Sequence, residues 1–148
     1  MTTFHMVCGL PASGKSTLAR QLAAQPDTIW LSPDEWMRRI VGDGYDNVRR
    51  DAVEQVQWEL ARKLLQLGLS VVLDNGFWSH AERAVFREEA ARVGAQTRLH
   101  FCDAPLAELQ RRAVARNRAL PQNAFHVEPD DLTRWSRLFE RPTVDELG

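Results

Sequence analysis

The stretch "GLPASGKST" at residues 9–17 constrains the fold more than any other part of the chain. It follows a short apolar run, "TFHMVCG", and opens a segment with helical spacing, "KSTLARQLAAQ". Its first eight residues match G-x-x-x-x-G-K-[ST] in full, and the composition of the chain gives roughly 5 × 10⁻⁴ accidental matches. A strand, a glycine-containing loop and a helix in this order predict a loop that cradles phosphate groups with its backbone amides.

Short apolar segments alternate with helical segments along the rest of the chain. Residues 28–32, 70–76 and 97–103 have the character of buried strands, and a helical pattern follows each. Ser32 with Glu35, and Ser79 with Glu82, predict capped helix starts. The alternation predicts an α/β fold of the three-layer P-loop NTPase type, with a short parallel sheet of about four strands and helices on both faces.

The longest helix is predicted from about residue 47 to residue 67, where Gly68 ends it. An apolar residue recurs in it at every fourth position, which predicts an amphipathic helix with one apolar stripe. The stripe consists of Val48, Ala52, Val56, Leu60 and Leu64.

The length of 148 residues suits one domain over residues 1–148, and a loop of about a dozen residues near 119–129 predicts a lid around 111–128.

The 19 basic and 20 acidic residues give a net charge of −1, so no global attraction to nucleic acid or to an anionic membrane is expected. No apolar run approaches 18 residues, which predicts no membrane span. Cys8 and Cys102 lie in strand-like runs, which indicates a reducing, cytoplasmic location. No obligate protein partner is indicated.

The phosphate loop predicts a nucleotide site, and the chemistry of each residue explains its place. Gly9 and Gly14 let the backbone curl around an anion. Lys15 is expected to reach the β- and γ-phosphates, Ser16 to bind Mg²⁺, and Thr17 to lie near the α-phosphate. The predicted ATP site comprises Gly9, Leu10, Pro11, Ala12, Ser13, Gly14, Lys15, Ser16 and Thr17.

Two acidic residues end the second and third predicted strands. Asp34 is a candidate general base that takes the proton of an acceptor hydroxyl, although an aspartate is also favoured in the first turn of any helix. Asp74 ends the run "VVLD" and is a candidate ligand of Mg²⁺ or of substrate, with Asn75 beside it. The sequence "DNG" is also a strong turn signal, so Asp74 could simply end the strand.

A group of arginines lies late in the fourth helical segment, at positions 111, 112, 116 and 118. Arg112 and Arg116 share one helix face, where they are candidates for stabilising a transferring phosphoryl group. A solvated arginine-rich face would give the same pattern. Arg83, in the helix after Asp74, is equally consistent with a salt bridge at the edge of the core and with a ligand contact.

Among the remaining candidates, Trp36 and Trp78 each follow a strand end with an acidic residue, so either could line an acceptor pocket. His80 and His126 stand alone, and no spacing of histidines or cysteines indicates a zinc site.

The segments "GLPASGKST", "LSPDEW", "VVLDNGFWSHAER" and "DAPLAELQRRAVARN", in that order, resemble the small P-loop kinases of the polynucleotide-kinase, zeta-toxin and chloramphenicol-phosphotransferase-like group. The resemblance implies Lys15 and Ser16 as phosphate and Mg²⁺ residues, Asp34 as general base and Arg116 as lid arginine. It also implies that Arg141, in "FERPTVDEL", lies near adenine.

This chain departs from the pattern of the phage-type kinases at two places. The arginine that those kinases carry three residues after the base falls on Met37, with Arg38 and Arg39 displaced. In addition, "DNGF", which begins at Asp74, replaces the threonine-containing stretch that is more usual after the third strand of those kinases. Both changes concern the acceptor, for which Arg38, Asp74, Asn75 and Trp78 are the candidate binding residues.

Together these features predict an ATP- and Mg²⁺-dependent kinase that phosphorylates a hydroxyl of a small molecule. A polynucleotide 5′-hydroxyl kinase is the alternative, and it would need a basic groove such as Arg38, Arg39, Arg49 and Arg50 could form. A nucleotide-binding regulatory ATPase with little transfer activity is a further alternative.

Overall fold

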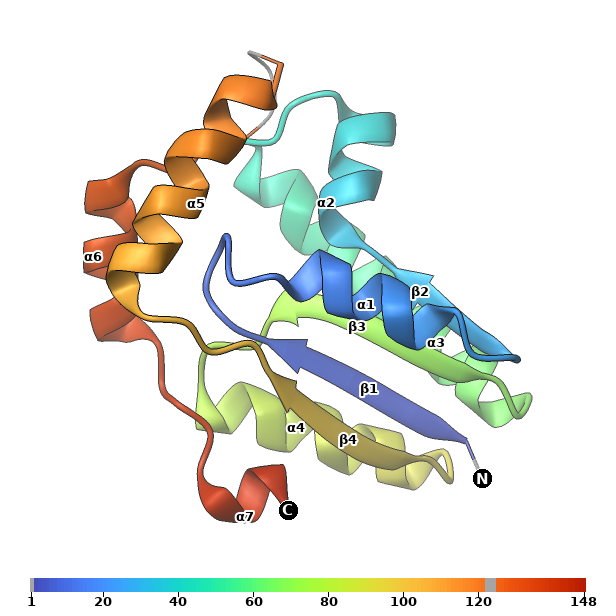
Figure 1. Ribbon diagram of the computed structural model, residues 1–148. Coiled ribbons are helices and arrows are strands. Elements are labelled where there is room, and N and C mark those ends of the chain that lie inside the picture. The colour runs from blue at the N-terminus through green and yellow to red at the C-terminus, as the bar shows by residue number, and fades with distance from the viewer. Residues whose placement is uncertain (1, 122–124) are drawn as a thin grey trace.

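The computed structural model describes residues 2–121 and 125–148, and Figure 1 shows its twelve helices and strands in those ranges. In chain order they are β1 (Thr3–Cys8), α1 (Lys15–Ala23), β2 (Thr28–Leu31), α2 (Pro33–Trp36), the π-helix η1 (Met37–Val41), α3 (Asn47–Gln66), β3 (Ser70–Gly76), α4 (His80–Arg92), β4 (Gln96–Phe101), α5 (Leu106–Ala119), α6 (Pro129–Leu138) and α7 (Val144–Leu147).

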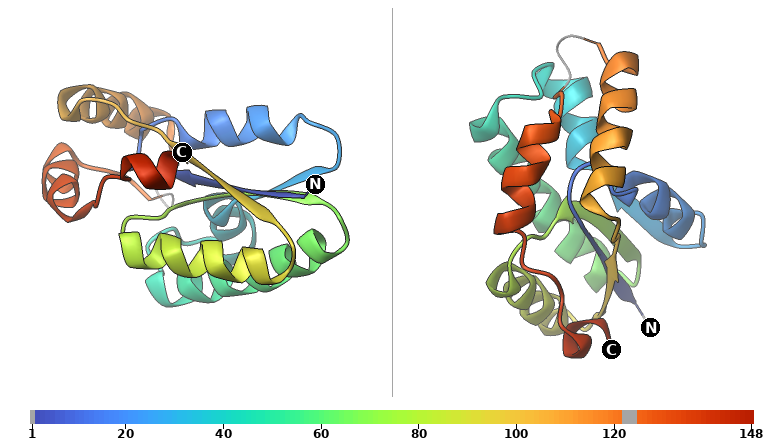
Figure 2. Two further views of the ribbon diagram at one scale, coloured as in Figure 1. Left: turned by 90° about the horizontal axis from the view of Figure 1, so that it is seen from below. Right: turned by 60° about the vertical axis from the view of Figure 1, so that its left-hand side comes forward.

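The four strands form one parallel sheet in the order β2-β3-β1-β4. Helix α1 covers one face, and α3 with α4 covers the other (Figure 2). Alternate residues of β1 pack to the two sides, with Phe4 and Met6 toward α3 and α4, and Val7 toward α1. The α/β prediction, a short parallel sheet of four strands between helices, is therefore confirmed.

Helices α5 and α6 do not cover the sheet. They pair with each other beyond the carboxyl ends of the strands (Figures 1 and 2) and have a small core of their own. In that core Leu109 and Ala113 of α5 meet Val127 and Leu132, all of them buried. The segment predicted as a lid lies here, except that residues 122–124 are outside the described ranges.

The predicted apolar stripe of α3 is wrong except at Leu64, which packs against the main core. Val48 is 82% exposed and Val56 is 52% exposed, whereas Trp58, Ala61 and Leu65 pack on the sheet. A step of four residues overshoots one turn of 3.6 residues, so five such positions fan over about 160° of the helix surface. A mixed spacing of three and four residues, which Trp58, Ala61 and Leu65 follow, stays on one face.

The helix boundaries follow the predicted capping signals. The Ser32 hydroxyl accepts a hydrogen bond from the Glu35 amide, and the Ser79 hydroxyl accepts one from the Glu82 amide. Helix α3 ends at Gln66, and Gly68 follows with a φ of +89°. The short α7 was not predicted, since the sequence indicates only a tail there.

Candidate active site

The phosphate loop joins β1 to α1 in a conformation that needs small residues. A side-chain carbon at Gly9 would lie 2.6 Å from the Ser13 hydroxyl and 2.8 Å from the Cys102 carbonyl. Gly14 has a φ of +97°, which strains any residue with a side chain. The loop thereby turns back on itself and opens α1 at Lys15, with the amino end of the helix toward the enclosed space.

Lys15 folds into this loop. Its ammonium group donates a hydrogen bond to the Leu10 carbonyl at 2.9 Å. Burial lowers the pKa of Lys15, and the carboxylates of Asp34 and Asp74 oppose that shift. A partly desolvated ammonium between a loop of amides and two carboxylates is suited to holding an anion such as a terminal phosphate.

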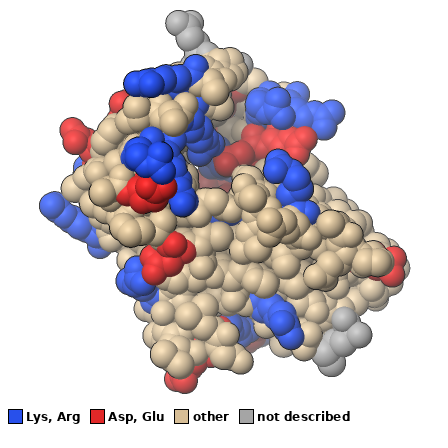
Figure 3. All heavy atoms as spheres, in the orientation of Figure 1, with Lys and Arg blue, Asp and Glu red and all other residues tan. Residues whose placement is uncertain are grey.

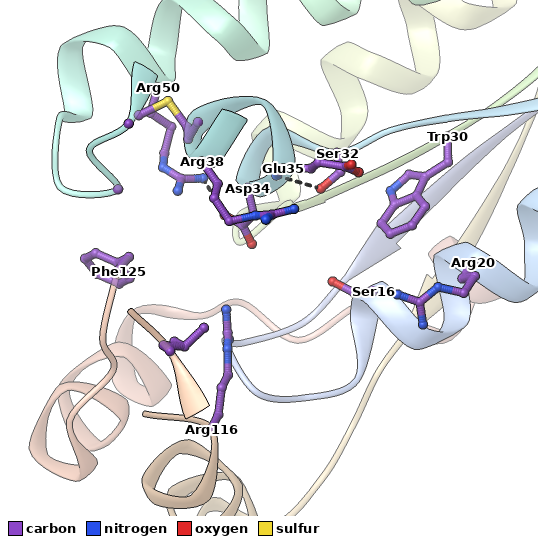
Figure 4. A pocket seen from close by; sticks show the side chains of 14 residues that line it. Ser16, Arg20, Trp30, Ser32, Asp34, Glu35, Arg38, Arg50, Arg116 and Phe125 are labelled. Atoms are coloured by element: carbon purple, nitrogen blue, oxygen red, sulfur yellow. Dashed lines mark hydrogen bonds and ion pairs between the residues drawn. The ribbon is translucent and has the colours of Figure 1, made fainter. Parts of the chain in front are cut away.

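Asp34 lies in the first turn of α2, at the carboxyl end of β2, and its side chain is 60% exposed. Arg50 of α3 meets it, with Nη1 at 2.9 Å from Oδ1. Figure 4 shows both side chains at the rim of a cavity, with Arg116 approaching from the opposite side. The carboxylate is held on one oxygen while it remains open to a substrate.

Asp74 lies near the carboxyl end of β3, two residues before the last residue of the strand, Gly76, and is only 8% exposed. Its Oδ1 is buried without a hydrogen-bond partner in the described part of the chain, and so is the Oδ1 of Asn75. Burial raises the pKa of Asp74, while the nearby Trp30 indole and Lys15 oppose the shift. A buried carboxylate with unused lone pairs needs a ligand to satisfy it.

These oxygens fit a magnesium ion that is shared with a nucleotide. Such an ion is commonly held by one or two carboxylates, the hydroxyl after the loop lysine and the phosphates. Asp74 and Ser16 line one cavity together and supply that donor set. Within the described ranges no group of three or more His, Cys, Asp or Glu side chains could hold a metal ion.

Two adjoining cavities, of about 720 Å³ and 470 Å³, bring the site residues together. The larger is lined by Lys15, Asp34, Asp74, Asn75, Trp78, Arg112 and Arg116, among others. The smaller adds Arg20, Trp30, Ser32, Glu35 and Arg38. Figure 3 shows the opening as a hollow, with Lys and Arg side chains on its α5 side and both acidic and basic side chains opposite.

Arg38 reaches the smaller cavity although Met37 occupies the position three residues after Asp34. Met37 is 1% exposed, and its carbonyl accepts the Gly42 amide at 2.8 Å, five residues ahead. Residues four apart share one face of a helix, so Arg38 lies on the side of Asp34, as Figure 4 shows. The displaced arginine is therefore brought beside the acid.

The arginines of α5 separate into two kinds. Arg111 pairs with Glu108 on the solvent side, with 72% of its side chain exposed. Arg112 also bonds Glu108 and lies 3.4 Å from the Ala12 carbonyl of the phosphate loop. Arg116 lines both cavities and has no ion-pair partner among the described residues, which leaves its charge for a ligand.

Arg83 and Arg141 lie outside these cavities. Arg83 is 2% exposed and bonds Glu146 at 2.7 Å and the carbonyls of Phe77 and Glu140, so it attaches the carboxyl-terminal segment to α4. Of the two alternatives for Arg83, the geometry shows the salt bridge. Arg141 pairs with Asp103 at 2.6 Å and stacks over Phe101, in a separate cavity of about 430 Å³ beyond Leu10.

The other candidates also have defined places. Trp78 lines the larger cavity, whereas Trp36 packs against the main core. His80 bonds Glu146, and the His126 ring nitrogen bonds the Pro121 carbonyl.

Sequence reasoning missed the contacts that close the site. The His126 amide donates to the Tyr45 hydroxyl at 3.0 Å, and the rings of Tyr45 and Phe125 lie 5.0 Å apart. Gly44 packs so closely that a side-chain carbon would meet the Phe125 amide nitrogen at 2.7 Å. Asn117 exchanges two hydrogen bonds with the Val127 backbone, which fixes this segment to α5. Of these residues only Gly44 gives a signal in the sequence, because glycine often marks a place where the backbone turns or packs closely.

The fold and the loop define a kinase-like P-loop NTPase. The chain belongs to the AAA domain family AAA_33, which matches residues 4–142. No curated protein matches it. No helix in the described ranges is both long and apolar enough to cross a membrane.

Solved structures share the fold at low sequence identity. A protein of Chloroflexus aurantiacus j-10-fl, provisionally described as a kinase, is 24% identical with a TM-score of 0.75, over 97% of this chain and 83% of that one. A chain of the Pnkp1/Rnl/Hen1 RNA repair complex is 16% identical with a TM-score of 0.76, over 90% of this chain but 42% of that one. A gluconokinase from Sinorhizobium meliloti 1021 is 16% identical with a TM-score of 0.64, over 97% and 77%.

Proposed function

We propose that the protein is an ATP- and Mg²⁺-dependent kinase that transfers the γ-phosphoryl group of ATP to a hydroxyl of a small molecule. One observation carries the proposal: Lys15, Asp34 and Asp74 line a single cavity of about 720 Å³ at the carboxyl edge of the sheet. A phosphate-binding cation therefore lies opposite a carboxylate that remains open to solvent. Pure hydrolysis would not require a cavity of this size beside the base.

In the proposed reaction the acceptor oxygen attacks the γ-phosphorus, the bond from that phosphorus to the β,γ-bridging oxygen breaks, and ADP leaves with the electron pair. Asp34 takes the proton of the hydroxyl through the oxygen that Arg50 does not hold. Lys15 and Arg116 stabilise the charge on the transferring group. Ser16 and Asp74 are the residues that would hold Mg²⁺, which neutralises phosphate charge when bound.

The segment around residues 111–128 is proposed to act as a lid of this single domain. In the described part of that segment, Arg112 and Arg116 face the site from α5, and Phe125 meets Gly44 on the other side. Closure of this kind excludes water and favours transfer over hydrolysis.

The test is transfer of labelled phosphate from ATP to a panel of metabolites. Asp34→Asn is expected to lower transfer by about 10²–10⁴-fold while ATP affinity stays within a factor of about two. Lys15→Ala is expected to weaken ATP binding as well. Glu59→Gln, an exposed substitution on α3, is the matched control. Unchanged transfer in Asp34→Asn would refute the role of the base, and ATP hydrolysis without transfer to any acceptor would favour the regulatory ATPase.

A polynucleotide 5′-hydroxyl is a second candidate acceptor, because the smaller cavity holds Arg20 and Arg38 without a carboxylate partner among the described residues. Such guanidinium groups suit a phosphate of a nucleic-acid chain. This candidate predicts that 5′-hydroxyl oligonucleotides are phosphorylated, that Arg38→Gln abolishes their use, and that the reaction weakens steeply with salt.

A further inference from the structure

The larger cavity has a wall of aromatic rings that come from two distant parts of the chain. Trp78 follows β3, and Trp135 belongs to α6; their ring centroids are 5.9 Å apart. Phe125 stacks on Trp135 at 6.2 Å with an interplanar angle of 23°. All three line the cavity, and we call them the aromatic wall.

The rings of the aromatic wall are not fully buried in the protein core. Each of its three residues is only partly buried, so the rings contribute surface to the cavity. Rings held in this way offer flat apolar area at a low cost in side-chain entropy. A cavity lined by rings with a few polar groups is typical of a site for an organic ligand.

Two buried side-chain oxygens that face the same cavity have no hydrogen-bond partner in the described part of the chain. Asp74 is 8% exposed with Oδ1 unbonded, and Asn75 carries a second unbonded buried oxygen directly after it. Both residues precede Trp78 at the end of β3, next to the rings. Because the proposed function assigns Asp74 to Mg²⁺, a ligand on the aromatic wall would lie beside the Asn75 oxygen as its unsatisfied acceptor.

The cationic groups of the cavity are accounted for by other partners. Arg50 pairs with Asp34, Arg112 bonds Glu108, and Lys15 lies within the phosphate loop. In the proposed function Lys15 and Arg116 hold the phosphates of ATP. The rings thus remain for a part of the acceptor that carries no charge.

We propose that the aromatic wall binds the acceptor, and that the acceptor is an uncharged alcohol with a flat ring, which stacks on Trp78 and Trp135 and directs its hydroxyl to Asp34. This inference rests on the proposed kinase function and assigns its substrate class. The volume of about 720 Å³ must also hold the terminal phosphates, so the ring compound is small. Phe125 links ring binding to closure of the lid, because it contacts Gly44 across the site.

The first experiment compares acceptors. Labelled ATP is incubated with aryl and heteroaryl alcohols (nucleosides among them), with glycerol, and with a 5′-hydroxyl oligonucleotide. The expected result is a kcat/KM at least about tenfold higher for a ring alcohol than for glycerol. Equal use of glycerol, or use of the oligonucleotide alone, would overturn the assignment of the acceptor while leaving phosphoryl transfer established.

The second experiment changes the wall. Trp135→Leu is expected to raise the acceptor KM about tenfold and to leave the Kd of a non-hydrolysable ATP analogue unchanged. Trp135→Phe retains a ring and should restore most of the loss. Leu138→Ala, on the same helix at a site that is 66% exposed, is the control for general damage to α6. If Trp135→Leu instead raised the Kd of the ATP analogue and left the acceptor KM unchanged, the wall would bind the nucleobase.

A third measurement separates the inference from the kinase proposal. Binding of ring alcohols is followed by intrinsic tryptophan fluorescence and calorimetry in the presence of the ATP analogue, without turnover. Saturable binding whose calorimetric Kd rises in Trp135→Leu supports the aromatic wall even if no phosphorylated product forms. Ring alcohols that bind no more tightly than glycerol would refute it.

Discussion

Arg50 of α3 reaches Asp34 of α2, and its Nη1 lies 2.9 Å from Oδ1 of the carboxylate. The arginine side chain is 24% exposed, whereas the aspartate side chain is 60% exposed. Arg50, the more buried partner, therefore holds the carboxylate of the more exposed Asp34 in place. In the proposed reaction Asp34 is the general base, which must be held within a few tenths of an ångström of its working position, so we propose a positioning role for Arg50.

Arg50→Gln is expected to lower kcat by about tenfold and to leave ATP affinity nearly unchanged, because the carboxylate loses its fixed orientation but remains present. Steady-state kinetics with a confirmed acceptor measures the effect. Arg49→Gln is the matched control, since Arg49 is adjacent in α3 but pairs with Asp46, and its side chain is 68% exposed. Equal losses in both variants would show that the substitution acts on α3 rather than on Asp34.

Gly44 tests the closure of the lid. In Gly44→Ala the new methyl carbon would lie 2.7 Å from the Phe125 amide nitrogen, and a backbone atom cannot yield as the end of a side chain can. We expect the contact to open, transfer to fall about tenfold and uncoupled ATP hydrolysis to rise. The ratio of hydrolysis to transfer is the measurement.

Tyr45→Phe serves as the milder companion of Gly44→Ala. It removes only the hydroxyl that accepts the His126 amide and keeps the ring against Phe125. Its effect on the ratio should therefore be smaller and in the same direction. Wild-type coupling in Gly44→Ala would mean that the segment after α5 does not close over the site.

Local signals in the sequence predicted those parts of the structure that depend on neighbours in the chain. The phosphate loop, the caps at Ser32 and Ser79, and the strand that carries Asp74 each follow from a few consecutive residues. Contacts between distant segments left no such signal. Arg50 of α3 and Asp34 of α2 meet across the intervening η1 and loop, and no spacing rule indicates that geometry.

The aromatic wall shows the same limit. Trp78 and Trp135 are 57 positions apart, and each resembles an ordinary core tryptophan in the sequence. They meet because α6 packs on α5 beyond the sheet. The wrong stripe on α3 has a different origin, since a period of four residues does not match the 3.6 residues of a helical turn.

Glu146 gives a prediction for acid stability. The Arg83 guanidinium, together with the Thr143 amide and His80, lowers the pKa of Glu146 from 4.5 to about 2 against the effect of burial. A carboxyl with a lowered folded pKa contributes stability above its unfolded value and loses it as the pH falls through the folded value. This contribution is complete above about pH 5 and is lost between about pH 5 and pH 2.

Glu146→Gln is expected to lower the free energy of unfolding by about 2 kcal/mol at pH 7, and the difference from wild type should shrink toward pH 2. Urea unfolding at several pH values measures it. Glu88→Gln is the control, because Glu88 pairs with Arg92 at the surface and its side chain is 66% exposed. A constant difference for Glu146→Gln across this range would contradict the assignment to the Arg83 pair.

Glu54 predicts the opposite pH dependence. It lines a cavity of about 580 Å³ with Trp58 and Trp78, and burial raises its pKa from 4.5 to about 7, reinforced by Glu82, Asp51 and Asp34 and opposed by Arg50. The folded protein therefore keeps this proton after the unfolded chain has released it, and stability falls as the pH rises from about 4.5 to about 7.

Glu54→Gln mimics the protonated form, so its Tm should exceed that of wild type at pH 8 and equal it near pH 4. Glu59→Gln, exposed on the same helix, should show no such trend. Equal Tm differences at both pH values would place Glu54 in water rather than against the rings.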